Sequence, residues 1–467
     1  MKFIPKTRQG SLILSAIDET IFDEAVARRD VPENVKANVK KYFRSTIQAL
    51  EEDPKAQFDI EDAKIAALFF KWISALHAGN KVLADQCEAD IDASVKNNPF
   101  PYSETKYWFE AASGKIEQDK AYASAKKIYR NWKTSPGGGG KKDFGVIEAT
   151  ISETAKIAVI GDWGTGTSDS FLLFKQMMER DKGIEAILHL GDIYQAGTPF
   201  ECAQNFLNPI EKMFKDEGWP RLPILTIPGN HEYFTFGKGY FSLIDVLNHD
   251  LPKWKQEASY FCLRSSKGNW QFLGADTGIG CIEHPKQPGI EDSEMEWHAD
   301  KLDGFKGRTV FMTHHQFVSA YGTLNDGGSG DSVYYNARLL GQLGPELSSI
   351  QLWMWGHDHW FTPYAKDLTI PGQAQILQRG QLLGGSAREV TRTPRVVYPA
   401  TDDSKGSFTP AQSNPRYYNH TYAIIDLATA TINYYQSPAW DEDNPPNPIN
   451  KAVPPGPLFQ YKIAAPK

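Results

Sequence analysis

The stretch IAVIGDWG, residues 157–164, carries the clearest signal of the fold, because a short apolar run ends abruptly in glycine and aspartate. The stretches ILHLGDIY (187–194) and LTIPGNHE (225–232) follow the same plan. Helical patterns at 171–180 and 293–302 separate such runs. Short apolar strands that alternate with helices are typical of layered α/β proteins. The sequence therefore predicts an α/β domain.

Polar clusters end five of the predicted strands, since THH (313–315) and GHDH (356–359) join the three stretches above. Ligands of open α/β sheets bind beyond the carboxyl ends of the strands, so these clusters can converge. Each cluster alone is also typical of an ordinary turn or cap, but the ordered set favours one site. Carboxylate, imidazole and amide ligands suit Fe, Mn or Zn. Because an aspartate has two oxygens, one aspartate can bridge two cations, and a metal pair supplies a hydroxide near neutral pH.

The ordered set GDWG, GDIY, PGNHE, THH and GHDH resembles the calcineurin-like metallophosphoesterase superfamily. Its first element is similar to the purple acid phosphatase branch, which has GDxG where most members have DxH. The resemblance spans about residues 155–436. It implies a metallophosphoesterase-type β-sandwich flanked by helices. It also implies that a hydroxide bound to two divalent or trivalent transition metals (Fe, Mn or Zn) hydrolyses phosphoesters.

The resemblance also assigns site residues by motif. It places Asp162 and His359 on the first metal, Asp192 between both metals, and Asn230, His314 and His357 on the second. His231 would face the phosphate and the leaving oxygen, as a charge stabiliser or general acid. The predicted catalytic residues are therefore His231, Asp192 and, with a role left open, His315.

The second motif departs from the purple branch, which reads GDxxY. Tyr194 stands one place early, and Gln195 takes the expected position of the tyrosine. A shift by one residue in an extended segment turns a side chain to the opposite side. The first site then has fewer protein ligands, uses Gln195 as a weak oxygen ligand, or bends the chain so that Tyr194 reaches it. We expect a protein that is not purple, has a weak or empty first site, and loses little metal in a Tyr194→Phe variant.

Two further residues are candidates for the site. His315 follows the expected ligand directly, and it either faces the substrate or packs beneath the strand. Arg388, after a Gly-Gly-Ser-Ala stretch, can reach a phosphate by a bidentate contact.

Composition excludes several classes of protein. The 467 residues carry 50 Lys+Arg against 57 Asp+Glu, a net charge of −7, whereas proteins that bind nucleic acid in bulk have a basic surplus. No apolar run approaches the ~18 residues of a membrane span, and the N-terminus does not read as a signal peptide. Four separated cysteines exclude a disulfide framework. We expect a cytoplasmic protein with no membrane contact.

The domain organisation follows from changes in composition along the chain. Residues 1–134 read as a separate all-helical N-terminal domain, 135–149 as a Gly-rich linker, 150–439 as the metallophosphoesterase domain and 440–467 as a Pro-rich tail. The N-terminal helices would form a lid, an oligomerisation surface or a dock for a protein partner. The expected substrate is a small phosphoester, with nucleotides among the candidates.

Two rival functions are open on the sequence alone. The altered tyrosine motif favours a catalytically degenerate phosphoesterase fold that acts as a binding or scaffold module. A scaffold has no physical need for seven polar site residues together, which argues against it. A protein serine/threonine phosphatase ranks lower, because those enzymes use DxH and GDxxDR forms that this chain lacks.

Overall fold

The computed structural model describes the chain from residue 118 to 357 with short gaps, and several further segments. The described residues are 71, 75, 80–96, 118–166, 168–194, 197, 199–285, 287–318, 324–325, 332–333, 335–357, 362–363, 368–369, 376–377, 380–382, 420–437 and 456–466. Most of the predicted N-terminal domain lies outside these residues, apart from helices α4 (Lys81–Lys96) and α6 (Gln118–Ile128). That prediction is therefore not tested.

One sheet has six strands in the order β17-β16-β15-β2-β3-β4. Its bounds are β2 (Lys156–Ile160), β3 (Ile184–His189), β4 (Ile224–Thr226), β15 (Thr421–Asp426), β16 (Thr431–Gln436) and β17 (Phe459–Lys462). The strands β2, β3 and β4 are parallel, so their carboxyl ends share one edge. The strands β15 and β16 form an antiparallel hairpin. The edge strand β17 comes from the stretch expected to form the Pro-rich tail.

The other large sheet has seven strands in the order β1-β5-β6-β7-β10-β14-β11. Its bounds are β1 (Val146–Ile151), β5 (Phe261–Ser265), β6 (Trp270–Ala275), β7 (Arg308–Thr313), β10 (Leu352–Trp355), β11 (Thr362–Pro363) and β14 (Gly380–Leu382). Two small hairpins are formed by β8 (Leu324–Asn325) with β9 (Ser332–Val333) and by β12 (Leu368–Thr369) with β13 (Ile376–Leu377). The strands β6, β7, β10 and β14 are parallel.

The two large sheets pack face to face around a shared hydrophobic core. Val159 and Leu188 of the six-stranded sheet lie in one buried cluster with Phe272 and Val310 of the seven-stranded sheet. A core that draws on inner faces of two sheets defines a sandwich. The predicted β-sandwich is therefore confirmed.

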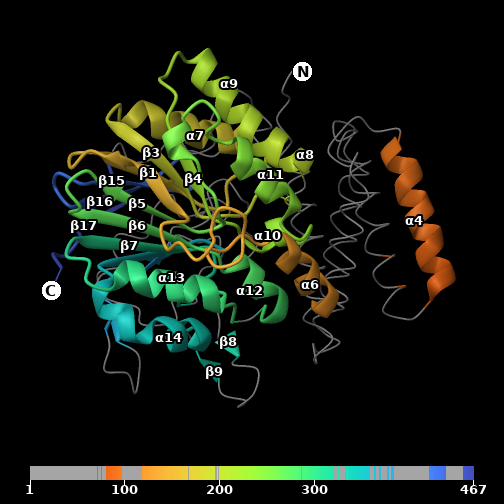
Figure 1. Ribbon diagram of the computed structural model, residues 1–467. Coiled ribbons are helices and arrows are strands. Elements are labelled where there is room, and N and C mark those ends of the chain that lie inside the picture. Colours follow the sequence, from red (N-terminus) through yellow and green to blue (C-terminus); the bar gives the residue numbers. More distant parts are fainter. Residues whose placement is uncertain are drawn as a thin grey trace.

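Helices cover both outer faces of the sandwich, as Figure 1 shows. Buried residues of α7 (Ser168–Arg180) and α9 (Asn208–Asp216) pack on the six-stranded sheet. Those of α12 (Gly278–Glu283), α13 (Asp292–Leu302) and α14 (Ala337–Leu343) pack on the seven-stranded sheet. The remaining helical elements are α8 (Pro199–Glu201), η2 (Cys202–Leu207), α10 (Asn230–Tyr233), α11 (Lys238–Val246), η3 (Pro252–Trp254) and η4 (Gly344–Ser349).

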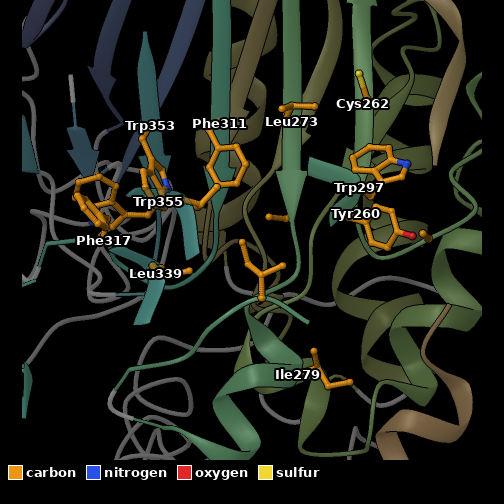
Figure 2. Close-up of a cluster of buried hydrophobic side chains, with 14 of the residues drawn as sticks. Tyr260, Cys262, Leu273, Ile279, Trp297, Phe311, Phe317, Leu339, Trp353 and Trp355 are labelled. Carbon is orange, nitrogen blue, oxygen red and sulfur yellow. The ribbon is translucent and has the colours of Figure 1, made fainter. Parts of the chain in front are cut away.

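Aromatic side chains dominate the core beneath α13 and α14. Figure 2 shows Phe317, Trp353 and Phe311 beside one another; the first two rings stack at 4.5 Å and the last two meet edge to face at 5.1 Å. Such contacts add to the free energy gained from burying apolar surface. They fix β7 and β10, the strands that lead to His314 and His357.

Helix α6 packs on the sandwich although it precedes the predicted linker. Ala125 and Tyr129 belong to the core of the seven-stranded sheet, and the Trp132 Nε1–H donates to the Ser293 carbonyl at 2.6 Å. The Tyr122 hydroxyl donates to Glu291 at 2.6 Å. The helix is therefore part of the same packed body as the predicted metallophosphoesterase domain, and the exact domain limits stay predictions.

Two observations concern the chemistry of the described chain as a whole. All four cysteines (Cys87, Cys202, Cys262 and Cys281) are free and buried. Among the described helices, none combines the length and the apolar character that a membrane crossing requires.

Candidate metal centre

The carboxyl ends of strands from both sheets bring the predicted ligands together. Asp162 follows β2 and Asp192 follows β3, while Asn230 begins α10 after β4. His314 and His357 follow β7 and β10. Two sets of potential ligand atoms each lie within 4.8 Å of one another: one from Asp162, Asp192 and His314, the other from His314, His315 and His357.

The backbone at this centre is strained. Asp162, Asp192 and His357 have φ values of +53°, +68° and +68°, in the left-handed region that non-glycine residues rarely adopt. Such a conformation costs about 1–3 kcal/mol per residue, and it persists where the surroundings enforce it. Three such residues in one cluster indicate that the chain holds these side chains in place at the expense of stability.

Glycines beside the ligands allow the chain to approach them closely. A Cβ atom on Gly229 would lie 2.0 Å from Asp192 Oδ1, and one on Gly356 would lie 2.4 Å from Asp162 Oδ2. Either contact is far inside van der Waals distance. The glycines of PGNHE and GHDH are therefore required by packing against the carboxylates.

Asp192 lies at the middle of the cluster. Its Oδ1 accepts a hydrogen bond from the His231 backbone N–H at 3.2 Å, and its Oδ2 lies 3.2 Å from His314 Nε2. Burial opposes ionisation, but the charges of His231 and His314 and the hydrogen bond from His314 hold the pKa of Asp192 well below its usual range. The side chain is a buried carboxylate with both oxygens directed at other site residues, as a bridging ligand requires.

The potential ligands of the second metal surround the same point. His357 Nδ1 lies 3.0 Å from Asn230 Oδ1 and 3.3 Å from His314 Nε2. His314 Nδ1 lies 2.8 Å from the Leu190 carbonyl. That nitrogen must carry the proton, since a carbonyl oxygen only accepts, and in the neutral ring Nε2 then presents a lone pair.

The buried carboxylates of Asp162 and Asp192 favour a positive charge beside them. Burial lowers the pKa of His314, but the charges of Asp192 and Asp162 and the Asp192 hydrogen bond outweigh it and raise this pKa to about 9. A divalent cation would satisfy the same carboxylates and leave the imidazole neutral. The donor set of carboxylate, amide and imidazole therefore fits the metal ions implied by the sequence.

Tyr194 reaches the first site. Its hydroxyl donates to Asp162 Oδ1 at 3.1 Å and to Asp192 Oδ2 at 3.3 Å. The expectation that the tyrosine turns away was wrong, because it assumed an extended segment. Gly191 (φ +96°) and Asp192 (φ +68°) bend the chain, so the structure corresponds to the third alternative, in which a bent chain brings Tyr194 to the site.

His231 is held beside the carboxylates with its ring enclosed. Its Nε2 lies 3.7 Å from Asp192 Oδ2. The Tyr194 ring meets it edge to face at 4.5 Å, and the Phe234 ring lies at 4.7 Å. This packing fixes the imidazole beside the Asp192 carboxylate.

His315 is buried in the same cluster. Its Nδ1 lies 2.9 Å from Thr277 Oγ1, and its ring centroid lies 4.5 Å from that of His357. Burial and the neighbouring His357 and His314 hold its pKa well below the usual range, so the ring is neutral.

Glu232 has a positioning role that the sequence motifs did not assign. Its Oε2 accepts from the N–H groups of Gly229 and Asp192, at 2.7 and 3.2 Å, and its Oε1 accepts from Ile193 at 2.6 Å. Burial and the charge of Asp192 raise its pKa to about 7. The carboxyl group ties the turn after β3 to the start of α10. The sequence signal that could have indicated this role of Glu232 is its place in the PGNHE motif.

Three predicted candidates lie outside the described residues: Gln195, His359 and Arg388. The described part of the first site therefore consists of Asp162, Asp192 and Tyr194. The predicted ligands of the second site are all described.

One comparison with known proteins identifies a domain in the chain. A family model described as calcineurin-like phosphoesterase matches residues 155–361, which contain every described strand-end residue above. The chain thus contains a calcineurin-like phosphoesterase domain over these residues. Among solved structures, it is similar to a dimetal phosphatase from Danio rerio, with 12% identity, a TM-score of 0.37, and coverage of 60% of this chain and 95% of that chain. No curated protein matches the chain.

Proposed function

We propose that this protein is a two-metal hydrolase of phosphate monoesters or diesters of small-molecule or nucleotide type. The observation that carries the proposal is the buried group of Asp162, Asp192 and His314, whose ligand atoms lie within 4.8 Å of one another. Buried carboxylates are costly unless they are paired or bind metals. Their position at strand ends of a phosphoesterase domain supports hydrolysis.

Two metals fit the described donors better than one. Asp192 directs Oδ2 toward His314, and the same oxygen accepts a hydrogen bond from Tyr194, which also donates to Asp162. The first metal would be held by Asp162 and Asp192 with Tyr194 beside them. The second would be held by Asp192, Asn230, His314 and His357. Fe, Mn and Zn all suit these ligands.

Bound metals would polarise the phosphoryl oxygen and lower the pKa of a water molecule, which supplies the nucleophile. Within the chain, the Asp192 Oδ1 contact with the His231 backbone N–H places the His231 imidazole at the edge of the site. From there His231 can donate a proton to the leaving oxygen, or its charged form can stabilise the developing negative charge. Glu232 accepts from the backbone N–H groups of Asp192 and Gly229 and so ties the turn that carries Asp192 to the turn before His231.

The finer assignments belong to the same proposal. The GDxG element and the Tyr194 contacts support a place near the purple acid phosphatase branch. A small phosphoester, with a nucleotide among the candidates, is the proposed substrate, and the cytoplasm is the proposed location. The N-terminal region is proposed to mediate oligomerisation or to bind a protein partner.

The first test is hydrolysis of an aryl phosphate monoester and an aryl phosphate diester by chelator-stripped protein, with Mn, Zn, Fe or Co added back. Asp192→Asn removes the carboxylate charge at the centre of the site and should abolish turnover and lower bound metal together. Asp250→Asn is the matched control, because Asp250 is an exposed carboxylate with only a 3.9 Å contact to Arg221.

Metal-restored turnover in the wild type and in Asp250→Asn, but not in Asp192→Asn, supports the hydrolase, and the better ester names the substrate class. Full activity in Asp192→Asn contradicts the bridging role. If the folded wild type shows no turnover with any metal, the degenerate scaffold is the better interpretation.

A further inference from the structure

His315 has an unsatisfied nitrogen in a polar, buried place. The side chain is 1% exposed, and its Nε2 has no hydrogen-bond partner among the described residues. A buried nitrogen without a partner costs about 1–3 kcal/mol, so a ligand at this atom would recover that free energy.

The other nitrogen of the ring is fixed by Thr277. The Thr277 hydroxyl oxygen lies 2.9 Å from His315 Nδ1, and it also accepts a hydrogen bond from the His315 backbone N–H at 3.1 Å. With the ring proton on Nδ1, that nitrogen donates to Thr277 Oγ1 and Nε2 keeps its lone pair. His314 shows the same arrangement, since its Nδ1 donates to the Leu190 carbonyl. Metal-binding histidines are oriented in this way, because the ring nitrogen that does not bind the metal donates a hydrogen bond to a neighbouring group.

His315 belongs to a group of histidines with metal-ligand spacing. Ligand atoms of His314, His315 and His357 lie within 4.8 Å of one another. Two ligand atoms at ~2.1 Å on opposite sides of one ion are about 4.2 Å apart, so small shifts bring all three nitrogens onto one metal. The ring centroids of His314 and His357 lie 4.9 and 4.5 Å from that of His315.

We propose that His315 is a third imidazole ligand of the second metal, bound through Nε2 and oriented by Thr277. The inference rests on the proposed two-metal site, and it adds a ligand that the family motifs do not assign. The second metal would then have His314, His315, His357, Asn230 and the Asp192 carboxylate around it. Three imidazoles favour Zn, Fe or Co over Mg, because nitrogen donors suit transition metals.

A role in contacting the phosphate is the competing assignment. It requires a proton on Nε2, because only an N–H can donate to a phosphate oxygen. The Thr277 hydroxyl would then have to donate to Nδ1. The two assignments therefore differ in which nitrogen carries the proton and in whether the metal site depends on His315.

The test measures Zn²⁺ and Co²⁺ affinity of the chelator-stripped chain by competition with a chromophoric chelator, without any substrate. His315→Gln should weaken the second binding step by more than about 100-fold. Thr277→Val keeps the side-chain shape but removes the hydroxyl, and it should weaken the same step by about 10–100-fold. His249→Gln is the control, because His249 is an exposed histidine outside the site.

Failure of this inference is distinguishable from failure of the proposed function. Unchanged affinity in His315→Gln, together with reduced turnover, would overturn the ligand role and favour a phosphate contact while the two-metal hydrolase stands. A wild-type chain that binds neither metal would overturn both.

A second measurement avoids the variants. Long-range ¹H–¹⁵N spectra of histidine-labelled wild type, recorded without metal and with Zn²⁺, report each ring nitrogen. The inference requires a zinc-dependent shift of His315 Nε2 with the proton kept on Nδ1. A His315 Nε2 signal that does not respond while His314 Nε2 responds would contradict it.

Discussion

Tyr194 shows how much a single backbone angle decides at the residue scale. The sequence places this tyrosine one position early for the purple-type motif, and a regular extended segment would point it away. The left-handed conformation of Asp192 turns the chain, so the hydroxyl reaches the carboxylates of Asp162 and Asp192. The hydroxyl orients both carboxylates directly, and it is the only donor from this turn's side chains that the structure describes.

Replacing Tyr194 by phenylalanine should therefore weaken the first metal site. We expect a loss of metal affinity of about 10–100-fold, the size typical of removing a group that orients metal ligands. Competition with a chromophoric chelator measures it, in Tyr194→Phe and in Tyr435→Phe. The second variant removes a hydroxyl at a ring that stacks on Tyr422 outside the site. Equal affinities in both variants would show that the hydroxyl contacts are incidental.

Helix α6 is the element whose role the sequence does not reveal. It precedes the linker-like stretch, yet the Tyr129 hydroxyl donates to the buried Glu294 Oε2 at 2.6 Å. Glu294 Oε1 in turn accepts the Asp276 N–H at 2.8 Å, and Asp276 accepts from the Tyr233 hydroxyl at 2.5 Å. Tyr233 belongs to α10, which carries Asn230 and His231. A chain of buried hydrogen bonds thus connects α6 to the helix at the metal centre.

Removal of the Tyr129 hydroxyl should destabilise the whole domain. Tyr129→Phe leaves a buried carboxyl oxygen without its donor, which costs about 1–3 kcal/mol of unfolding free energy. Tyr122→Phe, on α6 itself, is the matched control for Tyr129, which directly follows the helix. Its partner Glu291 lies at a partly exposed site, so this variant should cost less than about 1 kcal/mol. Urea unfolding of the two variants measures both. Equal losses of unfolding free energy in the two variants would mean that the buried Tyr129 hydroxyl contributes no more to stability than the Tyr122 hydroxyl.

The elements and the ligands were predictable from the sequence for a definite physical reason. Apolar runs with polar ends specify parallel strands with a common edge, and this pattern brings Asp162 and Asp192 together at the ends of β2 and β3. His314 follows β7 of the other sheet, and it joins them because the two sheets pack face to face. The bend at Asp192 was not predictable, because it depends on contacts with His231 and His314 that are distant in sequence. The packing of α6 was not predictable for the same reason, because no residue close to Tyr129 in the sequence indicates its distant partner Glu294.

At the scale of the whole molecule, the buried carboxyl groups of Asp276 and Glu294 lie in one hydrogen-bond network. Burial and the charge of Glu294 raise the pKa of Asp276 to about 8, against hydrogen bonds from Ser259 and Tyr233. Burial also raises the pKa of Glu294 to about 8, although hydrogen bonds from Tyr129 and Asp276 oppose it. Both groups therefore hold protons in the folded protein at pH values where they are ionised in the unfolded chain.

These raised pKa values make the stability of the folded protein fall as pH rises. Between about pH 4.5 and 8 the folded state binds more protons than the unfolded state, so these groups lower the unfolding free energy as pH rises. Their stabilising contribution is complete below the unfolded pKa and is lost as pH passes through the folded pKa near 8. Each group contributes a slope of up to about 1.4 kcal/mol per pH unit.

Glu294→Gln removes the contribution of one of these groups to the pH dependence of the unfolding free energy. The glutamine side chain resembles the protonated form of the glutamic acid. Relative to wild type, the chelator-stripped variant should gain unfolding free energy between pH 5.5 and 7.5, by up to about 1.4 kcal/mol per pH unit. Glu296→Gln is the control on the same helix, because that side chain is exposed and only pairs with Lys133 at the surface. For this control, the plot of unfolding free energy against pH should run parallel to that of the wild type. A Glu294→Gln curve that also runs parallel would mean that Glu294 is ionised in the folded protein, and the His298 ring, whose Nε2 lies 3.1 Å from Glu294 Oε1, would then be the cation beside it.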